Sequence, residues 1–408
     1  MVEMYHGKLG MKDYFREKYL IRDNPFSIAP SPREIFWADR KKVFEEIKNA
    51  IETSISTSPS RIIVNWGLWG GGKTHAMVYF TSDVFKEEIR KIYGPEIDFI
   101  QVGLRLPRPT ETGKIADLLY YEIINAITPE VIRQAVTRIN KYIQEKENVD
   151  AFKAAEKLRA YFSTLTKRRE YANVLTRLIQ GIRPSERKFI YREKLSPKEI
   201  RDLGLTREIE SISDMLDFLG LVTDVLTQPF EDLPEMMSEL FIWIDENEAI
   251  RDLSARDVFI YRSFLRDLID YIPREVTVFL NFSLSVGEDY STIEAQLGDA
   301  VISRVDRDIY FDVMKTLGEC LEYVRGLMEH VRIGKVDDPY HPFTEDAVKY
   351  MISQQIEKGT LPRDLNRIFG RALEIGYLKG AKRIDEKFII DNRELIFSKT
   401  YLSQSVKS

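Results

Sequence analysis

The sequence predicts an α/β protein: a parallel sheet interrupted by a large helical insertion and followed by an all-helical domain. Residues 24–112 and 236–311 alternate apolar runs typical of buried strands with amphipathic helical stretches, which indicates a parallel sheet with crossover helices on both faces. Residues 113–235 and 312–392 show helical periodicity without comparable strands. The expected organisation is an N-terminal arm (1–23), a sheet core (24–112 and 236–311), a helical insertion (113–235), a C-terminal helical domain (312–392) and a tail (393–408).

The composition limits the class of protein. The chain has 408 residues, 44% hydrophobic and 31% charged, as in soluble globular proteins of two or three domains. Its net charge of -5 means that any surface for nucleic acid must be local. A single cysteine, Cys320, excludes a disulfide framework and a cysteine-built zinc site, and the four histidines show no metal-binding spacing. No apolar run is long enough to span a membrane and the charged N-terminus lacks a signal-peptide core, so we expect a cytoplasmic location.

The strongest motif is a phosphate-binding loop. An apolar run from Ile62 to Val64 precedes Gly67-Leu-Trp-Gly-Gly-Gly72-Lys73-Thr74, which fits G-x-x-x-x-G-K-[ST] at every fixed position. In such a loop the glycines let backbone N–H groups surround a polyphosphate, the lysine reaches the β- and γ-phosphates, and the threonine hydroxyl is a ligand for Mg²⁺. The alternative is a glycine-rich strand-to-helix turn without a ligand. Candidate ATP contacts are Gly67, Trp69, Gly70, Gly71, Gly72, Lys73, Thr74 and His75.

The other elements are expected in order along the chain. A helix begins near Asp39, because apolar residues recur every four positions up to Ile55. A single amphipathic helix is expected from Ala76 to Tyr93, after the phosphate-binding loop. Further strands are expected at 97–106, 240–244, 276–282 and 307–311, and further helices at 113–127, 256–271 and 293–304.

Polar residues follow two of these strands directly. Asp245 and Glu246 end the first, and the carboxyl ends of parallel strands form the edge of a sheet where nucleotides bind. Asp245 is predicted to hold Mg²⁺ through water, and Glu246 to act as the general base that polarises the attacking water. Glu248 competes for the base role, although we expect it to be a solvated loop acid. Asn281, at the end of the next strand, either senses the γ-phosphate and aligns the water or caps a turn.

Together these motifs resemble an AAA+ ATPase. The chain is most similar to the clade that holds origin-recognition and replication-initiator ATPases, ExeA-type secretion ATPases and transposition ATPases. The resemblance covers roughly residues 20–112 and 236–390. The segments that carry it are Asn24-Pro-Phe26, Gly67 to Thr74, Asp245-Glu246, Asn281, Arg304 and Leu361-Pro-Arg363-Asp-Leu-Asn366.

The resemblance implies roles for residues outside the phosphate-binding loop. Asn24 and Phe26, in a segment that continues to Pro30 and Pro32, would cover the adenine, and the helices from 312 to 392 would form a lid. Asn281 would be the sensor-1 residue.

Two arginines also acquire implied roles. Arg363 would be the sensor-2 arginine, whose permanently charged guanidinium suits a γ-phosphate contact. Arg304 stands where the family carries an arginine finger, supplied to the ATP of a neighbouring subunit. Arg307 competes with it, and a surface helix arginine is the alternative reading of Arg304.

The insertion at 113–235 is longer than the family requires, and we expect the resemblance to end at the lid, without the winged-helix domain that follows it in the initiators. From Lys153 to Arg207 the insertion has 15 Lys and Arg against 6 Asp and Glu, a net charge of +9, with interleaved aromatic residues. This pattern suits a DNA backbone without sequence-specific readout; a protein partner, or a solvated face that offsets the acidic stretch at 208–239, is the alternative. The candidate DNA contacts are Lys167, Arg168, Arg169, Arg187 and Lys188.

The sequence therefore predicts a cytoplasmic, homo-oligomeric enzyme that binds ATP and Mg²⁺ and hydrolyses ATP. The enzyme would act on DNA or a nucleoprotein complex, in replication, transposition, segregation or mobile-element defence. The alternative is a nucleotide-dependent switch with slow or partner-stimulated turnover, whose insertion binds a protein.

Overall fold

The structure, a computed structural model, describes residues 10–28, 35–38, 40–108 and 114–398. The chain forms two compact units. We call Glu46–Trp66 with Asp83–Ile309 the sheet unit, and Met1–Glu45 with Gly67–Ser82 and Tyr310–Ser408 the helical unit. The sheet unit combines the predicted insertion with most of the predicted core, and the domain boundaries given above stay predictions.

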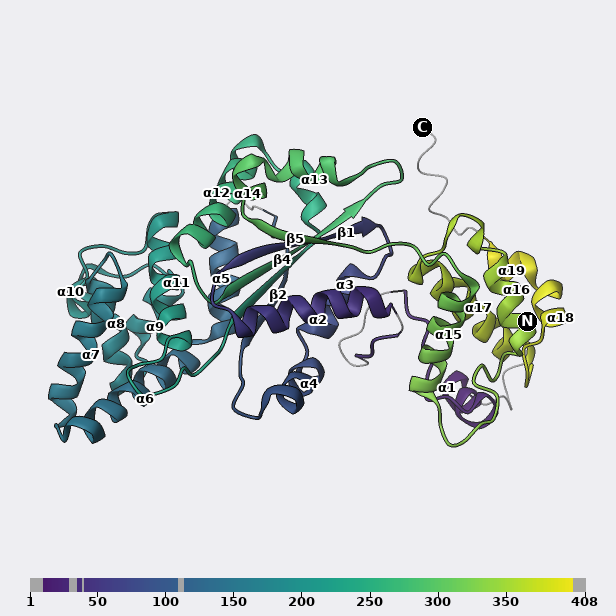
Figure 1. The fold of residues 1–408 in the computed structure, drawn as a ribbon, viewed down its shortest axis with the longest axis horizontal. Coiled ribbons are helices and arrows are strands. Elements are labelled where there is room, and N and C mark those ends of the chain that lie inside the picture. The colour runs from purple at the N-terminus through teal and green to yellow at the C-terminus, as the bar shows by residue number, and fades with distance from the viewer. Residues whose placement is uncertain (1–9, 29–34, 39, 109–113, 399–408) are drawn as a thin grey trace. The chain divides into compact units, whose positions relative to one another are not determined.

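A five-stranded sheet forms the centre of the sheet unit (Figure 1). Its strand order is β2-β3-β4-β1-β5, and β3 pairs in parallel with both β2 and β4. Every residue of β3 is buried, as expected for a parallel strand covered on both faces. The predicted parallel sheet is thus confirmed. The strands are β1 (Arg61–Leu68), β2 (Ile100–Arg105), β3 (Leu240–Asp245), β4 (Val276–Leu284) and β5 (Val305–Tyr310).

Two of the predicted helices are each divided. The prediction of a single helix from Ala76 to Tyr93 is wrong, because the chain forms two helices there, α3 (Lys73–Phe80) and α4 (Asp83–Tyr93). The hydroxyls of Thr81 and Ser82 donate to carbonyls of the preceding turn, at 2.7 Å and 2.6 Å, and so compete with continuation of the helix. The helix expected at 293–304 is likewise divided, at Gly298, whose φ is 74°. The helices that accompany the sheet are α2 (Lys41–Ser56), α4, α12 (Ala255–Tyr271), α13 (Tyr290–Leu297) and α14 (Asp299–Ile302), with a 3₁₀ turn at Asn247–Asp252.

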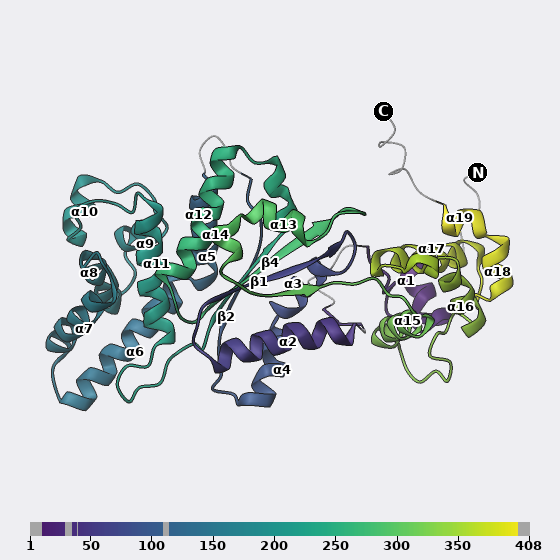
Figure 2. The same ribbon diagram turned by 45° about the horizontal axis from the view of Figure 1, so that its top comes forward.

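The insertion is helical throughout, as predicted. Figures 1 and 2 both show α6 to α11 gathered at one end of the sheet. Helix α11 packs against α5, α6, α7 and α12, so one continuous hydrophobic core runs from the sheet into the insertion. Its start is fixed by a reciprocal capping box between Ser211 and Asp214. The helices are α5 (Ile115–Ile127), α6 (Pro129–Glu147), α7 (Ala151–Leu165), α8 (Glu170–Arg177), α9 (Pro184–Ile190), α10 (Pro197–Leu203) and α11 (Ile212–Thr227), with a 3₁₀ turn at Leu178–Gln180.

The helical unit has a second hydrophobic core. The described part of the N-terminal arm contributes to this core through Phe15 and Tyr19, both fully buried. The elements of this unit are α1 (Met11–Tyr14), a π-helical turn (Phe15–Tyr19), α3, α15 (Leu317–Val331), α16 (Glu345–Ser353), a 3₁₀ turn (Ile356–Lys358), α17 (Pro362–Lys379), α18 (Glu386–Asp391) and α19 (Arg393–Phe397).

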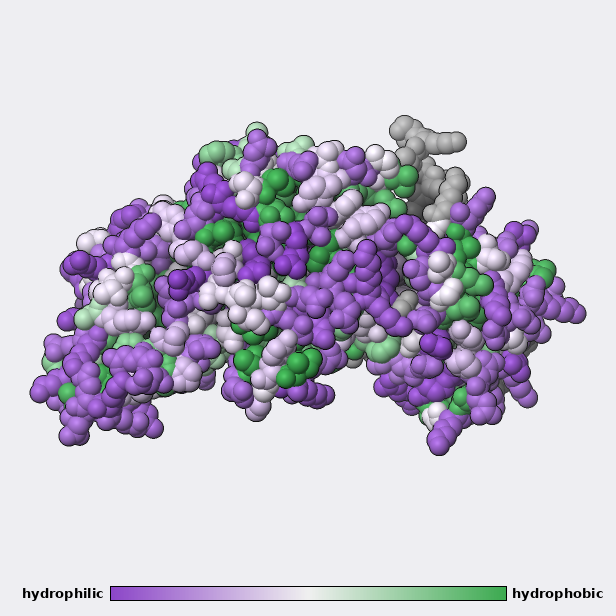
Figure 3. Space-filling view, viewed as in Figure 1, coloured by the Kyte–Doolittle hydropathy of each residue, from purple (hydrophilic) through white to green (hydrophobic). Residues whose placement is uncertain are grey.

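Hydrophilic residues cover most of the face in Figure 3, with smaller hydrophobic areas among them. Within the described ranges, no helix combines the length and the apolar character that a membrane span requires.

Candidate functional site

The phosphate-binding loop follows β1 and leads into α3. The residues from Gly67 onward, which include the loop and α3, belong to the helical unit. Gly67, Gly70 and Gly72 all have positive φ, at 148°, 86° and 99°, where side chains other than hydrogen are disfavoured. A Cβ on Gly67 would lie 2.6 Å from the carbonyl oxygen of Phe311, so the two backbones approach as closely as glycine allows. The residue types of the motif thus serve the shape of the loop itself.

Lys73 is the first residue of α3, and its side chain is folded into the loop. It is 4% exposed, and its Nζ donates to the carbonyl oxygens of Gly67 and Leu68 at 3.0 Å and 2.9 Å. The ammonium charge and the amino end of α3 therefore lie at the same loop, an arrangement suited to a polyphosphate. Thr74 is half-buried on the next position of the helix.

The two aromatic residues among the candidate ATP contacts, Trp69 and His75, lie in different environments. Trp69 is 49% exposed at the tip of the loop. The Nε2 of His75 lies 2.7 Å from the carbonyl oxygen of Phe36, so this nitrogen carries the proton, and the ring lies beside Trp37. Desolvation lowers the pKa of His75, which favours the neutral ring. The imidazole is therefore engaged in packing α3 against the N-terminal segment.

Arg363 lies against the phosphate-binding loop. It is near the start of α17; its backbone N–H approaches the carbonyl oxygen of Gly70 at 3.5 Å. Its Cδ and Nε lie 3.3 Å and 3.5 Å from the position of a Cβ on Gly70, and the side chain is exposed. The structure thus brings together the loop and the arginine that the resemblance paired with it.

Asn24 and Phe26 lie in the helical unit as well. The side-chain oxygen of Asn24 accepts the backbone N–H of Phe26 at 3.0 Å. The ring of Phe26 is 4% exposed, stacks on Phe369 at 5.3 Å and meets Phe343 edge-on. It is thus a core residue as well as a candidate adenine neighbour. Pro30 and Pro32 fall outside the described residues.

The acidic candidates lie at the carboxyl end of β3, in the sheet unit. Asp245 is 3% exposed, and its Oδ1 accepts a hydrogen bond from Nδ2 of Asn281 at 3.0 Å. Its Oδ2 is buried and has no hydrogen-bond partner among the described residues. A buried carboxylate oxygen without a partner is costly unless a cation or donor satisfies it, so Asp245 fits a divalent cation such as Mg²⁺. No group of three His, Cys, Asp or Glu in the part of the chain described is placed to hold a metal.

The two glutamates after Asp245 differ in environment. Glu246 takes a left-handed backbone conformation, with φ of 58°, and its half-exposed carboxylate lies 3.6 Å from the guanidinium of Arg105 on β2. Glu248 was expected to be a solvated loop acid, and this expectation is wrong. It is 9% exposed, and its Oε2 accepts the backbone N–H of Ser283 at 2.9 Å, because the 3₁₀ turn packs against the end of β4.

Asn281 is the centre of a buried amide network. Its Oδ1 accepts from Nδ2 of Asn65 on β1 at 2.9 Å, while its own Nδ2 donates to Asp245. Nδ2 of Asn247 donates to the backbone carbonyl of Asn281 at 3.3 Å, and Tyr261 donates its hydroxyl to Asn247. Asn65 and Asn247 were not among the residues predicted from the sequence. For Asn65 the available signal was an amide within an apolar run, two residues before Gly67.

Arg304 lies just after α14, in the sheet unit. It forms a two-pronged ion pair with Asp270, with Nε to Oδ1 at 2.8 Å and Nη2 to Oδ2 at 2.7 Å, and this hydrogen bonding lowers the pKa of Asp270. Arg307, its competitor, lies on β5 and pairs with Asp306 at 2.8 Å. The guanidinium proposed to act in a neighbouring subunit is therefore held by an acid of its own chain.

The basic candidates of the insertion have uneven exposure. Arg168 is enclosed: it pairs with Glu170 and lies 3.2 Å from Asp214 and 2.9 Å from the hydroxyl of Tyr171. Lys188 pairs with Glu199 at 2.8 Å.

The other three basic candidates are exposed. Lys167 lies over the ring of Tyr271 at 3.8 Å, and Arg187 lies 5.6 Å from the ring of Tyr191. Arg169 and Arg187 have exposed side chains. The positive charge available to a partner is thus smaller than the sequence count suggests.

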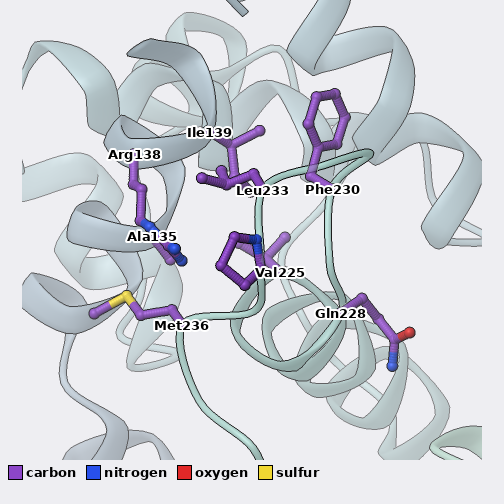
Figure 4. Close-up of a pocket in the computed structure, with 9 residues that line it drawn as sticks. Ala135, Arg138, Ile139, Val225, Gln228, Phe230, Leu233 and Met236 are labelled. Carbon is purple, nitrogen blue, oxygen red and sulfur yellow. The ribbon is translucent and has the colours of Figure 1, made fainter. Parts of the chain in front are cut away.

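A small pocket lies between α6, α11 and the chain that follows α11 (Figure 4). Its lining is mostly apolar and includes Ile139, Val225 and Phe230, with Arg138 extending from α6. It has neither a nucleophile nor a pair of titratable groups, so it offers no catalytic chemistry.

No protein-family model matches this sequence, and no curated protein matches it either. Solved structures do match. The ORC2 protein of Aeropyrum pernix, solved with ADPNP and ADP, has a TM-score of 0.50 and 13% identity over 95% of this chain and 74% of that chain. The ORC1 protein of the same organism, in complex with DNA, has a TM-score of 0.43 and 12% identity over 91% and 68%. A Walker-type ATPase of Pyrococcus abyssi has a TM-score of 0.41 and 14% identity over 87% and 74%.

At this level of identity the likeness shows the fold, and the ORC2 match carries it. The resemblance inferred from the motifs is confirmed at that level. The chain has an α/β P-loop fold similar to that of the ORC2 protein.

Proposed function

We propose that this chain is an AAA+ ATPase that binds ATP with Mg²⁺ and hydrolyses it. The observation that supports the proposal most strongly is the loop from Gly67 to Thr74, whose backbone curls around the buried ammonium of Lys73 at the amino end of α3. A cationic loop of N–H groups at a helix start is the arrangement that binds phosphates in this fold. The AAA+ fold itself is consistent with the proposal.

Each polar residue then has a distinct task. Thr74 and Asp245 hold the cation, which supplies charge neutralisation on the phosphates when bound. Glu246 accepts the proton of the attacking water, and Asn281 aligns that water. Arg363 contacts the γ-phosphate. This division follows from the motif and from the chemistry of the side chains.

We further propose that the enzyme acts on DNA or a nucleoprotein complex. What supports it is the set of exposed basic residues on the insertion, Arg169 and Arg187 among them. A protein partner for the insertion is the second candidate. Two observations favour it: Arg168 and Lys188 are engaged in ion pairs within the insertion, and Phe152 on α7 is 72% exposed.

The direct test of nucleotide binding is Lys73→Ala. Removing the ammonium should abolish binding of ATP and therefore turnover, measured by calorimetry and by phosphate release. Lys91→Ala, at an exposed position of α4, is the matched control and should bind as wild type. Equal affinity in the two variants would refute the proposed site.

Catalysis is tested separately at the two glutamates. Glu246→Gln should bind ATP and retain it, with turnover reduced by roughly 10²–10⁴-fold, the range for loss of a general base. If Glu246→Gln turned over normally and Glu248→Gln did not, the base would have to be reassigned to Glu248.

The stimulation of ATP turnover and the salt dependence of binding distinguish DNA from a protein as the partner. A DNA-acting enzyme should show faster ATP turnover with added DNA and an affinity that falls steeply with salt. ATP turnover that is unchanged by added DNA and rises with one co-purifying protein would favour the protein partner.

A further inference from the structure

Asn65 is an unusual residue for its position. It lies on β1 between Val64 and Trp66 and is completely buried, in a strand whose other residues up to that point are also buried. Burying an amide costs free energy unless hydrogen bonds replace those lost to water. The side chain must therefore be engaged by a particular neighbour.

That neighbour is Asn281, on the adjacent strand β4. Nδ2 of Asn65 donates to Oδ1 of Asn281 at 2.9 Å, and Nδ2 of Asn281 donates to Oδ1 of Asp245 at 3.0 Å. Three neighbouring strands, β1, β4 and β3, thus contribute one residue each to a chain of two hydrogen bonds. All three side chains are at most 3% exposed.

The direction of the two bonds is fixed by chemistry. An ionised Asp245 can only accept, so the amide of Asn281 must turn its nitrogen toward it and its oxygen toward β1. This orientation is favourable only if the group on β1 is a donor. Asn65 supplies that donor and so selects which end of the Asn281 amide faces the carboxylate.

Two oxygen atoms remain at the ends of this chain. Oδ1 of Asn65 and Oδ2 of Asp245 are both buried, and neither has a hydrogen-bond partner among the described residues. Both are acceptors of the hard oxygen type that a divalent cation and its bound waters satisfy.

We propose that Asn65 is a positioning residue for the cation-binding carboxylate. It orients Asn281, which in turn holds Oδ1 of Asp245 and leaves Oδ2 directed to the cation. The inference deepens the proposed function, on which it rests for the identity of the cation.

The first test measures cation affinity in Asn65→Leu, which removes the donor and keeps the branching of the side chain. The Mg²⁺ concentration for half-maximal ATP turnover should rise about 10-fold, the low end of the effect of losing an outer-shell partner of a metal ligand, because Asn65 acts on Asp245 through Asn281. Binding of Mn²⁺ to the ADP complex, followed by electron paramagnetic resonance, should weaken in parallel, while the KM for ATP at saturating Mg²⁺ stays as in wild type. Asn140→Leu, at a 2% exposed amide on α6, is the matched control and should leave the Mg²⁺ requirement unchanged.

Asn65→Val serves if the leucine variant does not fold, since valine suits a buried strand. Its expected shift is the same. A wild-type Mg²⁺ requirement in either variant would overturn the role of Asn65.

The second test needs no nucleotide. In a double-mutant cycle of Asn65→Leu and Asn281→Leu, the shifts of the urea midpoint should be non-additive, because each change removes the same hydrogen bond. The pair Asn65→Leu and Asn140→Leu should be additive. Additivity in the first pair would overturn the relay. A wild-type protein that neither binds nor hydrolyses ATP would overturn the proposed function, while the cycle would still decide whether the relay exists.

Discussion

Glu239, the residue before β3, is buried in an environment that is unfavourable for a charge. Its side chain is 1% exposed, and the hydroxyl of Thr277 donates to its Oε1 at 2.7 Å. Burial raises the pKa of Glu239 to about 9, Glu275 adds to the rise, and Thr277 and Arg61 oppose it. The fold therefore holds this carboxyl in its neutral form at physiological pH.

This raised pKa predicts a pH-dependent stability. The unfolded chain loses the proton of Glu239 near pH 4.5 and the folded chain near pH 9, so its favourable contribution is complete below pH 4.5 and lost as the pH rises to about 9. Between these values the free energy of unfolding should fall by at most about 1.4 kcal/mol per pH unit. Glu239→Gln should flatten this slope in urea titrations at pH 5, 7 and 9. Glu235→Gln, at an exposed position four residues earlier, should not; a slope unchanged by Glu239→Gln would contradict the assignment.

Spacing alone identifies some site residues and not others. Lys73 and Asp245 stand at fixed distances from a strand end, so the sequence predicts them. Asn65 has no such spacing, because one amide within an apolar run acquires meaning only from Asn281, 216 residues further on. Burial of Glu248 was missed for the same reason, since its partner Ser283 is 35 residues away.

At the scale of elements, the strands were more predictable than the helices. A strand buried on both faces is a continuous apolar run, so β3 could be placed within one residue of its ends. Where a helix stops depends on local hydrogen bonds, and two hydroxyl residues, Thr81 and Ser82, divided α3 from α4 within one continuous helical pattern.

The junction of α7 and α8 offers a test of the insertion. Arg168 is enclosed by Glu170, Asp214 and Tyr171, so Arg168→Ala should remove its ion pairs with the two carboxylates and lower the free energy of unfolding by about 2 kcal/mol. The loss is limited because Glu170 keeps Thr206 and Asp214 keeps Arg207 as partners. Arg169→Ala, at the exposed neighbouring position, should change it by less than about 0.5 kcal/mol. Urea denaturation of both variants measures the difference. Equal values would mean that the ion pairs of Arg168 contribute nothing.

The same pair of arginines separates stability from binding. If the insertion contacts DNA, Arg169→Glu should weaken binding and reduce the salt slope by about 1 for the lost phosphate contact. Because Arg168 is engaged internally, its loss would act on DNA binding only through unfolding.

At the scale of the whole molecule, the contacts between residues place a unit boundary after Trp66, where the sequence predicted one continuous core. The stretch Gly67–Ser82 groups with the C-terminal helices rather than with the sheet strand that precedes it. One reason is visible at Gly70, which Arg363 approaches from almost three hundred residues away along the chain. Contacts of this range leave no periodic signal in the sequence.

Arg304 provides the prediction for an assembly. If it acts on the ATP of a neighbouring subunit, Arg304→Ala should lower the turnover number while leaving ATP affinity unchanged. Mixing Arg304→Ala with Glu246→Gln should then restore part of the activity, because the first variant supplies an intact base and the second an intact arginine. Phosphate release from the mixed subunits measures this recovery, and Asp270→Asn tests release of the arginine from its own chain. A mixture no more active than its separate components would exclude the role in trans.

The four tryptophans of the chain occupy very different environments, and this gives the molecule a built-in optical signal. Trp243 is fully buried and stacked on Phe279 at 3.9 Å, so its emission should be blue-shifted and indifferent to solvent quenchers. Trp69, half exposed at the tip of the phosphate-binding loop, should emit at longer wavelength and be quenched by iodide. A nucleotide that binds in the loop should protect only the Trp69 emission from iodide. Trp69→Phe should abolish this protection. Loop occupancy can thus be followed in real time without a label.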